Sequence, residues 1–313
     1  MKNDRALAYG AFAIVCIVWG TTYLGIRIAV ETMTPLLLTG FRFTVAGAVL
    51  LTVSRLRGDV FPTDRRTLAN LALIGFLMVG VGNLAVVWAE QWVPSGMAAL
   101  LVASSPFWNA ILELIRKQGE RLDLRRGIGM LIGFIGVALL VTPRGAAGSF
   151  DVHFILGALA IQLGAICWQA GTMRAKYTVA GVPPLMSAGV QMLFGGIIVT
   201  TIGFAIGEAP HFHVTPRTFA ALAYLTLFGS VIAYTAYVFA LAKIRTTNMS
   251  LYAYINPVVA VLLGWLILDE RLTWVSITAM VVILGGVALV QTAGARRKPL
   301  ALPDERAAER NAA

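Results

Sequence analysis

The chain has 313 residues, of which 58% are hydrophobic and 13% are charged, and its mean hydropathy is +0.79. Soluble domains carry about 25% charged residues, so this composition excludes a protein that exposes most of its surface to water. The net charge of +10 does not indicate a nucleic-acid partner, because the Lys and Arg residues are spread along the chain rather than gathered into one basic region.

Apolar stretches of about the length of a membrane helix recur along the whole chain. A helix needs about 20 apolar residues to cross the hydrocarbon core of a bilayer, whereas strands of a membrane barrel alternate apolar and polar residues. The sequence therefore predicts an all-α membrane protein with ten transmembrane helices. We call them spans 1 to 10, and they cover residues 7–26, 35–54, 68–89, 95–115, 127–142, 154–173, 184–206, 218–241, 247–268 and 273–292.

The basic residues predict the orientation of these spans. If the N-terminus lies in the cytoplasm, 20 of the 25 Lys and Arg residues fall in cytoplasmic segments, four fall in external loops, and Arg42 lies within span 2. Cytoplasmic loops of membrane proteins are enriched in Lys and Arg. We therefore expect both termini in the cytoplasm and a multi-pass location in the plasma membrane, which in bacteria is the inner membrane.

The chain also contains an internal repeat. Residues 35–47, PLLLTGFRFTVAG, correspond to residues 184–196, PLMSAGVQMLFGG, and the same offset of 149 aligns Trp19 with Trp168. Five spans per copy is an odd number, so the second copy enters the membrane upside down, and its basic residues move to the opposite loops. Inverted repeats are typical of transporters whose substrate path lies between the halves. We expect a first five-helix repeat at 5–143, an inverted second repeat at 153–292, and a charged, disordered cytoplasmic tail at 294–313.

Four short motifs fall in fixed places on these spans: Trp-Gly-Thr-Thr-Tyr at 19–23, Phe-Arg-Phe at 41–43, Asn-Pro at 256–257 and Leu-Asp-Glu at 268–270. Their order on ten spans resembles the drug/metabolite transporter superfamily, and more narrowly its EamA-type members. The resemblance implies a pore lined mainly by spans 1, 3, 4, 6, 8 and 9, with spans 5 and 10 on the outside. Within that family, the chain resembles the branch that exports aromatic and other amino acids and confers resistance to viologen-type toxins.

Polar and aromatic side chains that share one helical face near mid-span are candidates for substrate binding. A lipid-facing stripe of polar groups would be costly, and aromatic rings with a polar edge suit aromatic or amphipathic ligands. The pattern fits both a cavity wall and close packing between helices, and the sequence leaves both open. The candidates are Trp19, Tyr23, Asn83, Ser105, Trp168, Gln169, Tyr234, Tyr237, Tyr252 and Asn256, and the repeat aligns Asn83 with Tyr234.

Two further pairs of residues are related by the repeat. Arg42 is the one charged residue well inside a span, and Gln191 occupies the equivalent place in the second half. Polar groups at both positions favour a structural hydrogen-bonding role, with recognition of a substrate carboxylate as the alternative. Pro106 and Pro257 match each other in spans 4 and 9. Proline kinks or breaks a helix, and paired interruptions favour a hinge near the binding region, with two kinks of no functional role as the alternative.

No acidic residue or His lies at the centre of a predicted span, and Glu90 and Glu113 lie at span ends. A proton-coupled carrier generally holds a titratable group at its site. We therefore expect transport without an intramembrane carboxylate, with Glu90 and Glu113 as the residual candidates. The sequence also lacks metal-ligand clusters and catalytic motifs, so we expect no metal, no cofactor and no enzymatic activity.

These patterns favour an exporter of small amphipathic metabolites, above all amino acids including aromatic ones, that works by alternating access to a central cavity. The alternative is a carrier of another class, for a cationic drug such as a viologen or for a nucleoside-type metabolite. The expected partners are a small-molecule substrate and the lipid bilayer. A monomer is compatible with the sequence, which does not fix the oligomeric state.

Overall fold

The structure, a computed structural model, describes residues 2–115, 124–140, 152–179, 181–243 and 252–295. Every regular element within these ranges is helical. The α-helices are α1 (Lys2–Ala29), α2 (Pro35–Leu56), α3 (Arg65–Gly75), α4 (Leu84–Ala89), α5 (Ser95–Val102), α6 (Ser105–Ile115), α7 (Leu124–Leu140), α8 (Val152–Thr178), α9 (Pro184–Ala205), α10 (Pro216–Tyr224), α11 (Ala233–Lys243), α13 (Tyr252–Leu268) and α14 (Trp274–Ala295). A 3₁₀ turn, η2, covers Ala209–His211, and two π-helical segments, η1 (Phe76–Asn83) and η3 (Leu225–Ile232), continue α3 and α10.

Seven helical stretches in the described ranges are long and apolar enough to cross a membrane: Ala6–Ala29, Pro35–Leu56, Arg65–Ala89, Ser95–Leu112, Val152–Ala175, Pro184–Ala205 and Pro216–Tyr237. Three shorter apolar helices, Gly127–Leu139, Ile255–Leu268 and Trp274–Val290, fall within predicted spans 5, 9 and 10. The prediction of an all-helical membrane protein is confirmed. The ten-span layout, the inverted repeat and the cytoplasmic termini stay predictions, and most of the predicted tail lies outside the described residues.

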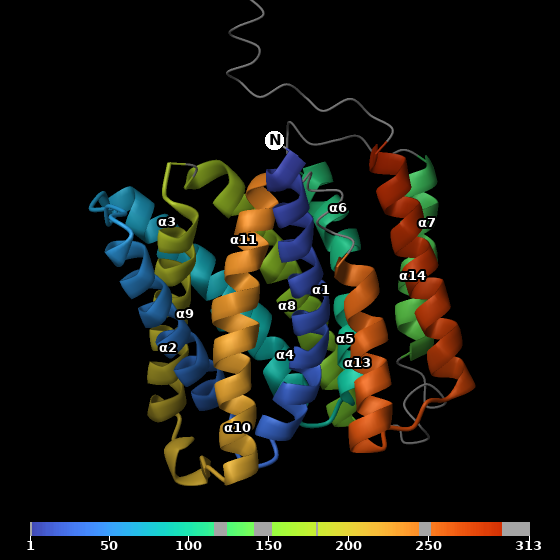
Figure 1. The fold of residues 1–313 in the computed structure, drawn as a ribbon. Helices are drawn as coiled ribbons and strands as arrows, with labels where there is room; N and C mark the ends of the chain where they lie inside the picture. Colours follow the sequence, from blue (N-terminus) through green and yellow to red (C-terminus); the bar gives the residue numbers. More distant parts are fainter. Residues whose placement is uncertain (1, 116–123, 141–151, 180, 244–251, 296–313) are drawn as a thin grey trace, which may run out of the picture.

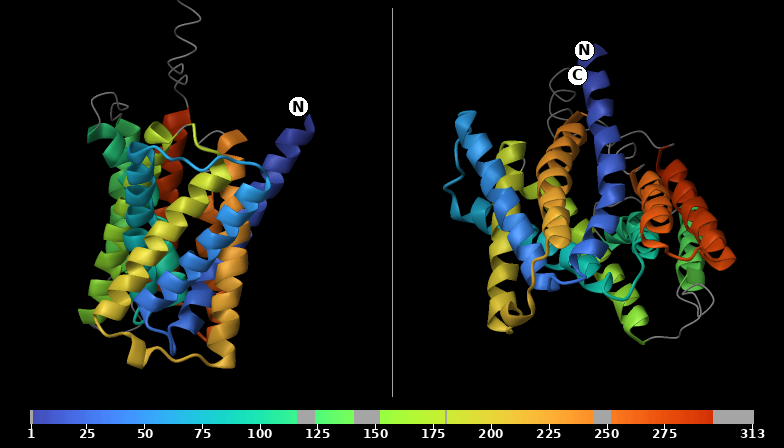
Figure 2. Two further views of the ribbon diagram at one scale, coloured as in Figure 1. Left: turned by 90° about the vertical axis from the view of Figure 1, so that its left-hand side faces the viewer. Right: turned by 60° about the horizontal axis from the view of Figure 1, so that its bottom comes forward.

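The helices stand side by side in one bundle (Figure 1). α2 packs against α9 on one flank, and α7 packs against α14 on the other, as two further views also show (Figure 2). Both pairs join spans that the repeat relates to each other, span 2 with span 7 and span 5 with span 10. The remaining helices fill the middle, where α1 contacts α11 and α13, and α8 contacts η1 and α4.

Glycine brings α2 and α9 into close backbone contact. A Cβ atom on Gly47 would lie 2.5 Å from the backbone nitrogen of Leu193, and a Cβ atom on Gly196 would lie 2.5 Å from the backbone nitrogen of Thr44. Gly47 and Gly196 are repeat mates at the offset of 149. Small residues allow helices in lipid to approach closely and to gain van der Waals contact, which explains why the repeat keeps glycine at both positions.

The two π-helical segments occupy matching places in the halves. η1 begins at Phe76 and η3 begins at Leu225, and this spacing of 149 aligns Asn83 with Ile232. The alignment of Asn83 with Tyr234 made from the sequence has an offset of 151 and differs from this spacing by two residues. Single π-turns inside α-helices are frequent at functional sites, and both segments lie beside the middle of the bundle.

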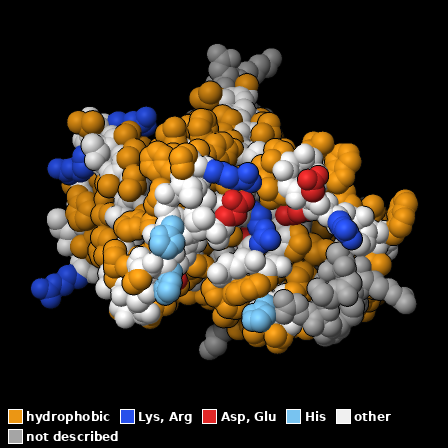
Figure 3. Space-filling view, turned by 90° about the horizontal axis from the view of Figure 1, so that it is seen from below, with side chains coloured by type: hydrophobic (Ala, Val, Ile, Leu, Met, Phe, Trp, Pro, Cys, Tyr) orange, Lys and Arg blue, Asp and Glu red, His pale blue; other side chains and the backbone are white. Residues whose placement is uncertain are grey.

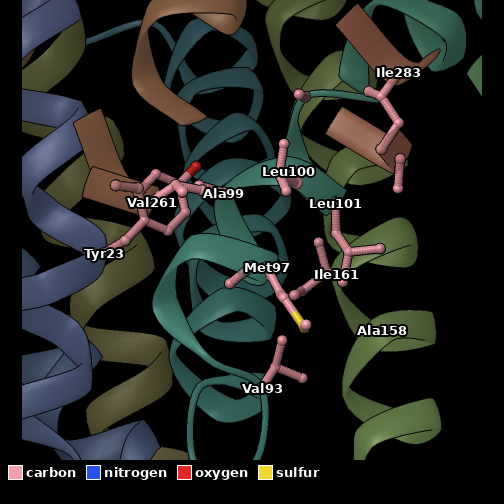
Figure 4. Packing of buried hydrophobic residues seen from close by; sticks show 14 of the residues in the cluster. Tyr23, Val93, Met97, Ala99, Leu100, Leu101, Ala158, Ile161, Val261 and Ile283 are labelled. Atoms are coloured by element: carbon pink, nitrogen blue, oxygen red, sulfur yellow. The ribbon is translucent and has the colours of Figure 1, made fainter. Parts of the chain in front are cut away.

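Span 4 forms the centre of the core. The residues of α5 from Ser95 to Leu101 are all buried, and Figure 4 shows Met97, Leu100 and Leu101 among side chains of α8, α13 and α14. α5 ends at Val102 and α6 begins at Ser105, so the helix is interrupted directly before Pro106. In contrast, Pro257 lies inside the continuous helix α13. The predicted interruption is thus present in span 4, while a hinge role for either proline stays a prediction.

The lower end of the bundle carries a mixture of charges. Figure 3, which views the molecule from this end, shows acidic, basic and His side chains toward the middle, hydrophobic side chains around them, and further basic side chains at one edge. One ion pair here joins Arg217 of α10 to Glu31, which follows α1, with 3.2 Å between Nη2 and Oε1. Both side chains are substantially exposed, so this pair contributes little to stability.

Candidate functional site

A cavity of about 110 Å³ lies in the middle of the bundle, between the two halves of the chain. Its wall comes from predicted spans 1, 2, 3, 4, 6, 8 and 9. The residues that line it are Trp19, Thr22, Tyr23, Ile26, Arg42, Phe43, Gly82, Asn83, Val86, Val102, Ser105, Gly164, Ala165, Trp168, Gly229, Tyr234, Tyr252 and Asn256. The six spans implied by the resemblance all contribute, and span 2 joins them through Arg42 and Phe43.

Trp19 is the centre of an aromatic cluster at this cavity. Its ring centroid lies 5.0 Å from that of Tyr237, 5.4 Å from Tyr252, 6.2 Å from Trp168 and 6.5 Å from Tyr234. These partners come from α8, α11 and α13 in the second half of the chain, whereas Trp19 lies on α1 in the first half. Trp168 and Tyr252 meet Trp19 edge to face, whereas Tyr237 and Tyr234 are tilted against it. Aromatic pairs at these distances attract each other, so the cluster ties the two halves together around an apolar surface.

Arg42 is buried in the cavity wall, with only 4% of its surface exposed. Its Nε atom donates a hydrogen bond to Ser230 Oγ at 2.9 Å, and its guanidinium carbon lies 4.7 Å from the ring centroid of Phe43. Its Nη1 atom has no hydrogen-bond partner within the described ranges. The guanidinium is therefore held in place on one side and free on the other.

Gly229, in η3, makes room for this arrangement. Its carbonyl accepts a hydrogen bond from Trp19 Nε1 at 3.2 Å. A Cβ atom at this position would lie 3.0 Å from Arg42 Nη2 and 2.9 Å from Thr22 Cγ2, closer than ordinary van der Waals contact. Gly229 thus lets the indole and the guanidinium meet the same turn of span 8. Sequence reasoning did not select Gly229 or its neighbour Ser230 as site residues.

The repeat mate of Arg42 has a different role. Gln191 is buried outside the cavity lining; its Nε2 donates to Ser187 Oγ at 2.8 Å, and its Oε1 accepts from the Tyr234 hydroxyl at 3.2 Å. Gln191 therefore orients Tyr234, which does line the cavity. The two equivalent positions provide one residue that contacts the cavity and one residue that positions a neighbour.

The remaining candidates divide into residues that line the cavity and residues that do not. Asn83 and Ser105 line it: the Asn83 Oδ1 atom is buried without a hydrogen-bond partner in the described part of the chain, and Ser105 donates to the Val102 carbonyl at 2.6 Å. Tyr23, Trp168, Tyr234, Tyr252 and Asn256 line it as well. Tyr237 is absent from the lining and packs behind Trp19, and Gln169 is partly buried on α8 away from the cavity.

A carboxylate lies just outside this cavity, at the end of span 3. The side chain of Glu90 is fully buried, and neither of its oxygens has a hydrogen-bond partner among the described residues, while Arg27 donates to its backbone carbonyl. Burial raises the pKa of Glu90, the nearby Glu270 raises it further, and Arg27 and Arg42 act in the opposite direction. Its place in the sequence predicted a residue near the external face, but its side chain points inward. The side chain of Glu113 lies outside the described residues.

The sequence matches known transporters along almost its whole length. Residues 6–142 and 155–292 match the EamA-like transporter family. The chain belongs to this family. The uncharacterized inner membrane transporter YedA of Escherichia coli K12 is 36% identical over 283 residues, which cover 90% of each chain. The uncharacterized transporter YoaV of Bacillus subtilis is 20% identical over 285 residues, which cover 91% of this chain and 96% of YoaV.

One further relative and one solved structure are similar to the chain. The chloroplastic WAT1-related protein At3g02690 of Arabidopsis thaliana is 25% identical over 289 residues, covering 87% of this chain and 66% of the plant protein. One solved crystal structure superimposes with a TM-score of 0.66 at 21% identity, covering 92% of this chain and 98% of the other, and this likeness supports the fold alone.

This EamA-like chain is a membrane transporter and a multi-pass protein of the plasma or inner membrane. The family predicted from the short motifs is confirmed, and family membership fits the expectation that the chain is not an enzyme. Its place in the amino-acid exporter branch stays a prediction.

Proposed function

We propose that this EamA-like protein exports small amphipathic metabolites, above all amino acids including aromatic ones, by alternating access to the central cavity. The observation that carries this proposal is the aromatic cluster around Trp19, which forms an apolar wall with polar edges between the two halves. Such walls bind ligands that combine a flat apolar group with a few polar groups. The candidate residues that line the cavity would contact the substrate.

The membrane arrangement in this proposal is ten spans in two inverted five-helix repeats, with both termini in the cytoplasm. One support is the distribution of Lys and Arg. Another is that the two π-helical segments are separated by the same 149 residues as the sequence repeat. A third is the pairing of α2 with α9 and of α7 with α14. In inverted-repeat carriers, the two halves exchange conformations around a fixed central site. Pro106 and Pro257 are the proposed hinge positions.

The cavity wall contains no Asp or Glu among the described residues, which supports transport without a carboxylate at the substrate site. The alternative substrate is a cationic drug of the viologen type or a nucleoside-type metabolite. Aromatic faces attract cations, so the cluster around Trp19 is the feature that would bind a cationic drug of the viologen type. The buried positive charge of Arg42 would oppose it.

Counterflow in proteoliposomes tests the proposal. Vesicles that contain the purified protein are loaded with unlabelled phenylalanine, and uptake of labelled phenylalanine is measured, with methyl viologen and uridine as competing probes. We expect phenylalanine counterflow, and we expect Trp19→Ala to slow it at least about tenfold, because each aromatic pair contributes about 0.5–1.5 kcal/mol. Trp265→Ala is the matched control, because Trp265 is 52% exposed on α13.

The outcomes separate the substrate classes. Exchange of viologen or uridine without exchange of phenylalanine would assign the transporter to the alternative class. Equal rates for the Trp19→Ala and Trp265→Ala variants would show that substrate does not use the cavity around Trp19.

A further inference from the structure

Two atoms in the cavity wall are buried and lack hydrogen-bond partners among the described residues: Arg42 Nη1 and Asn83 Oδ1. Folded proteins leave few buried polar groups unpaired. The two atoms have opposite hydrogen-bonding character, because Nη1 donates and Oδ1 accepts. Both residues line the cavity, so its wall holds one unused charged donor and one unused acceptor.

The environment of Arg42 favours an anion. Its guanidinium is fixed by the hydrogen bond to Ser230 and by contact with Phe43, and its buried Nη1 atom is left without a partner among the described residues. No carboxylate of the described residues forms an ion pair with Arg42. Glu90 interacts with Arg42 electrostatically, but its oxygens lie beyond hydrogen-bond distance. A planar guanidinium matches the geometry of a carboxylate, so an anionic group would supply the missing partner.

The environment of Asn83 favours a donor. Asn83 is the last residue of η1, and η1 contacts α2, the helix that carries Arg42. An ammonium group has three N–H donors and no acceptor, which suits an amide oxygen without a partner. The rest of the wall is aromatic and offers the apolar surface described above.

We propose that Arg42 and Asn83 form a head-group site for an α-amino acid, in which Arg42 binds the carboxylate and Asn83 accepts a hydrogen bond from the ammonium group. This inference rests on the proposed function and states how the substrate class is recognised. The side chain of the amino acid then lies against Trp19 and Trp168. The same site disfavours permanent cations, because they cannot pair with Arg42.

Binding of four probes to the full-length protein in detergent tests the head-group site. Phenylalanine carries both charges, phenylalaninamide lacks the carboxylate, 3-phenylpropionate lacks the ammonium group, and alanine lacks the ring. Intrinsic tryptophan fluorescence, to which Trp19 and Trp168 at the cavity contribute, and thermal shift both report binding without requiring transport. A site built to bond a polar group rejects analogues that lack it, so we expect phenylalanine to bind at least about tenfold more tightly than either ring analogue.

Two variants assign the contacts. Arg42→Gln should reduce the preference for phenylalanine over phenylalaninamide to less than about twofold, while the affinity for phenylalaninamide is unchanged. Asn83→Leu should reduce the preference for phenylalanine over 3-phenylpropionate to less than about twofold, while the affinity for 3-phenylpropionate is unchanged. Arg217→Gln is the matched control, because it removes one positive charge from an exposed site on α10. If Arg42→Gln fails to fold, Ser230→Ala keeps the charge, removes the Nε partner, and should weaken the same preference.

The results distinguish this inference from the proposed function. Equal binding of phenylalanine and its amide by the wild-type protein would overturn the head-group site even if phenylalanine is transported. Binding of alanine that depends on Arg42, without binding of phenylalanine, would support the head-group site and refute an aromatic substrate. If none of the four probes binds, both are refuted.

Discussion

Replacement of Gly229 by Ala would test whether the position of the Arg42 guanidinium matters, without removing any polar group. The added Cβ atom would lie 3.0 Å from Arg42 Nη2 and 2.9 Å from Thr22 Cγ2. Both contacts are too close, so the Thr22 methyl has to shift and the guanidinium, which is the far end of a flexible side chain, is displaced as well. We expect it to lose its 2.9 Å hydrogen bond to Ser230.

The magnitude follows from the hydrogen bond between the guanidinium and the substrate carboxylate, which a displaced guanidinium cannot make. A hydrogen bond to a charged group contributes about 1.5–3 kcal/mol, and each 1.4 kcal/mol corresponds to about a tenfold change in affinity. Gly229→Ala should therefore weaken phenylalanine binding by about 10-fold to 150-fold and leave phenylalaninamide binding nearly unchanged. Fluorescence titration of the purified variant measures both ligands.

The control is Gly285→Ala in α14, where no heavy atom lies within 4 Å of the added Cβ atom. Its affinities should equal those of the wild-type protein. Phenylalanine affinity within about twofold of wild type in a folded Gly229→Ala protein would refute the reasoning, because a displaced guanidinium cannot keep a carboxylate contact of unchanged strength.

Three further results are expected from thermal unfolding in detergent. The pKa of Glu90 is raised in the folded protein, so its contribution to stability should fall as pH rises above about 4.3, the pKa of Glu in an unfolded chain. Glu90→Gln should flatten this pH dependence of the melting temperature. An unchanged slope would contradict the expectation. Gly133→Ala would place a Cβ atom 1.9 Å from the Phe107 ring and should lower the free energy of unfolding by about 1–3 kcal/mol. A melting temperature equal to that of the wild-type protein would show that the ring moves freely. Glu270→Ala should cost about 1.5–3 kcal/mol, because the carboxylate accepts from the first two backbone amides of α5 at 2.7 and 3.1 Å; Asp269→Asn is the control, since asparagine tolerates the positive φ of 53° there.

The helical fold and the inward position of several aromatic residues could be predicted from the sequence. Apolar length alone predicted membrane helices, and the mid-span positions of Trp19 and Trp168 made them candidates for a cavity wall, which both residues line. Gln169 was selected together with Trp168, but consecutive residues of a helix point about 100° apart. Of the two, only Trp168 lines the cavity.

Other features depend on contacts that one sequence does not reveal. π-helical and α-helical segments of apolar residues look alike in sequence, so η1 and η3 were not predicted, and the part played by Gly229 and Ser230 followed from η3. Glu90 is at the end of a span, where a side chain can point to water or inward, and only the surrounding helices decide that it is buried.

The paired π-helical segments bear on how substrate choice can change among relatives of this transporter. Insertion or deletion of one residue in an α-helix turns everything beyond it by about 100° and lengthens or shortens the span by only about 1.5 Å. A single-residue insertion or deletion in η1 or η3 would therefore bring a new set of side chains to the cavity while the loops and the outer helix pairs stay where they are. Specificity in such proteins can change through the length of a span as well as through substitution of its residues.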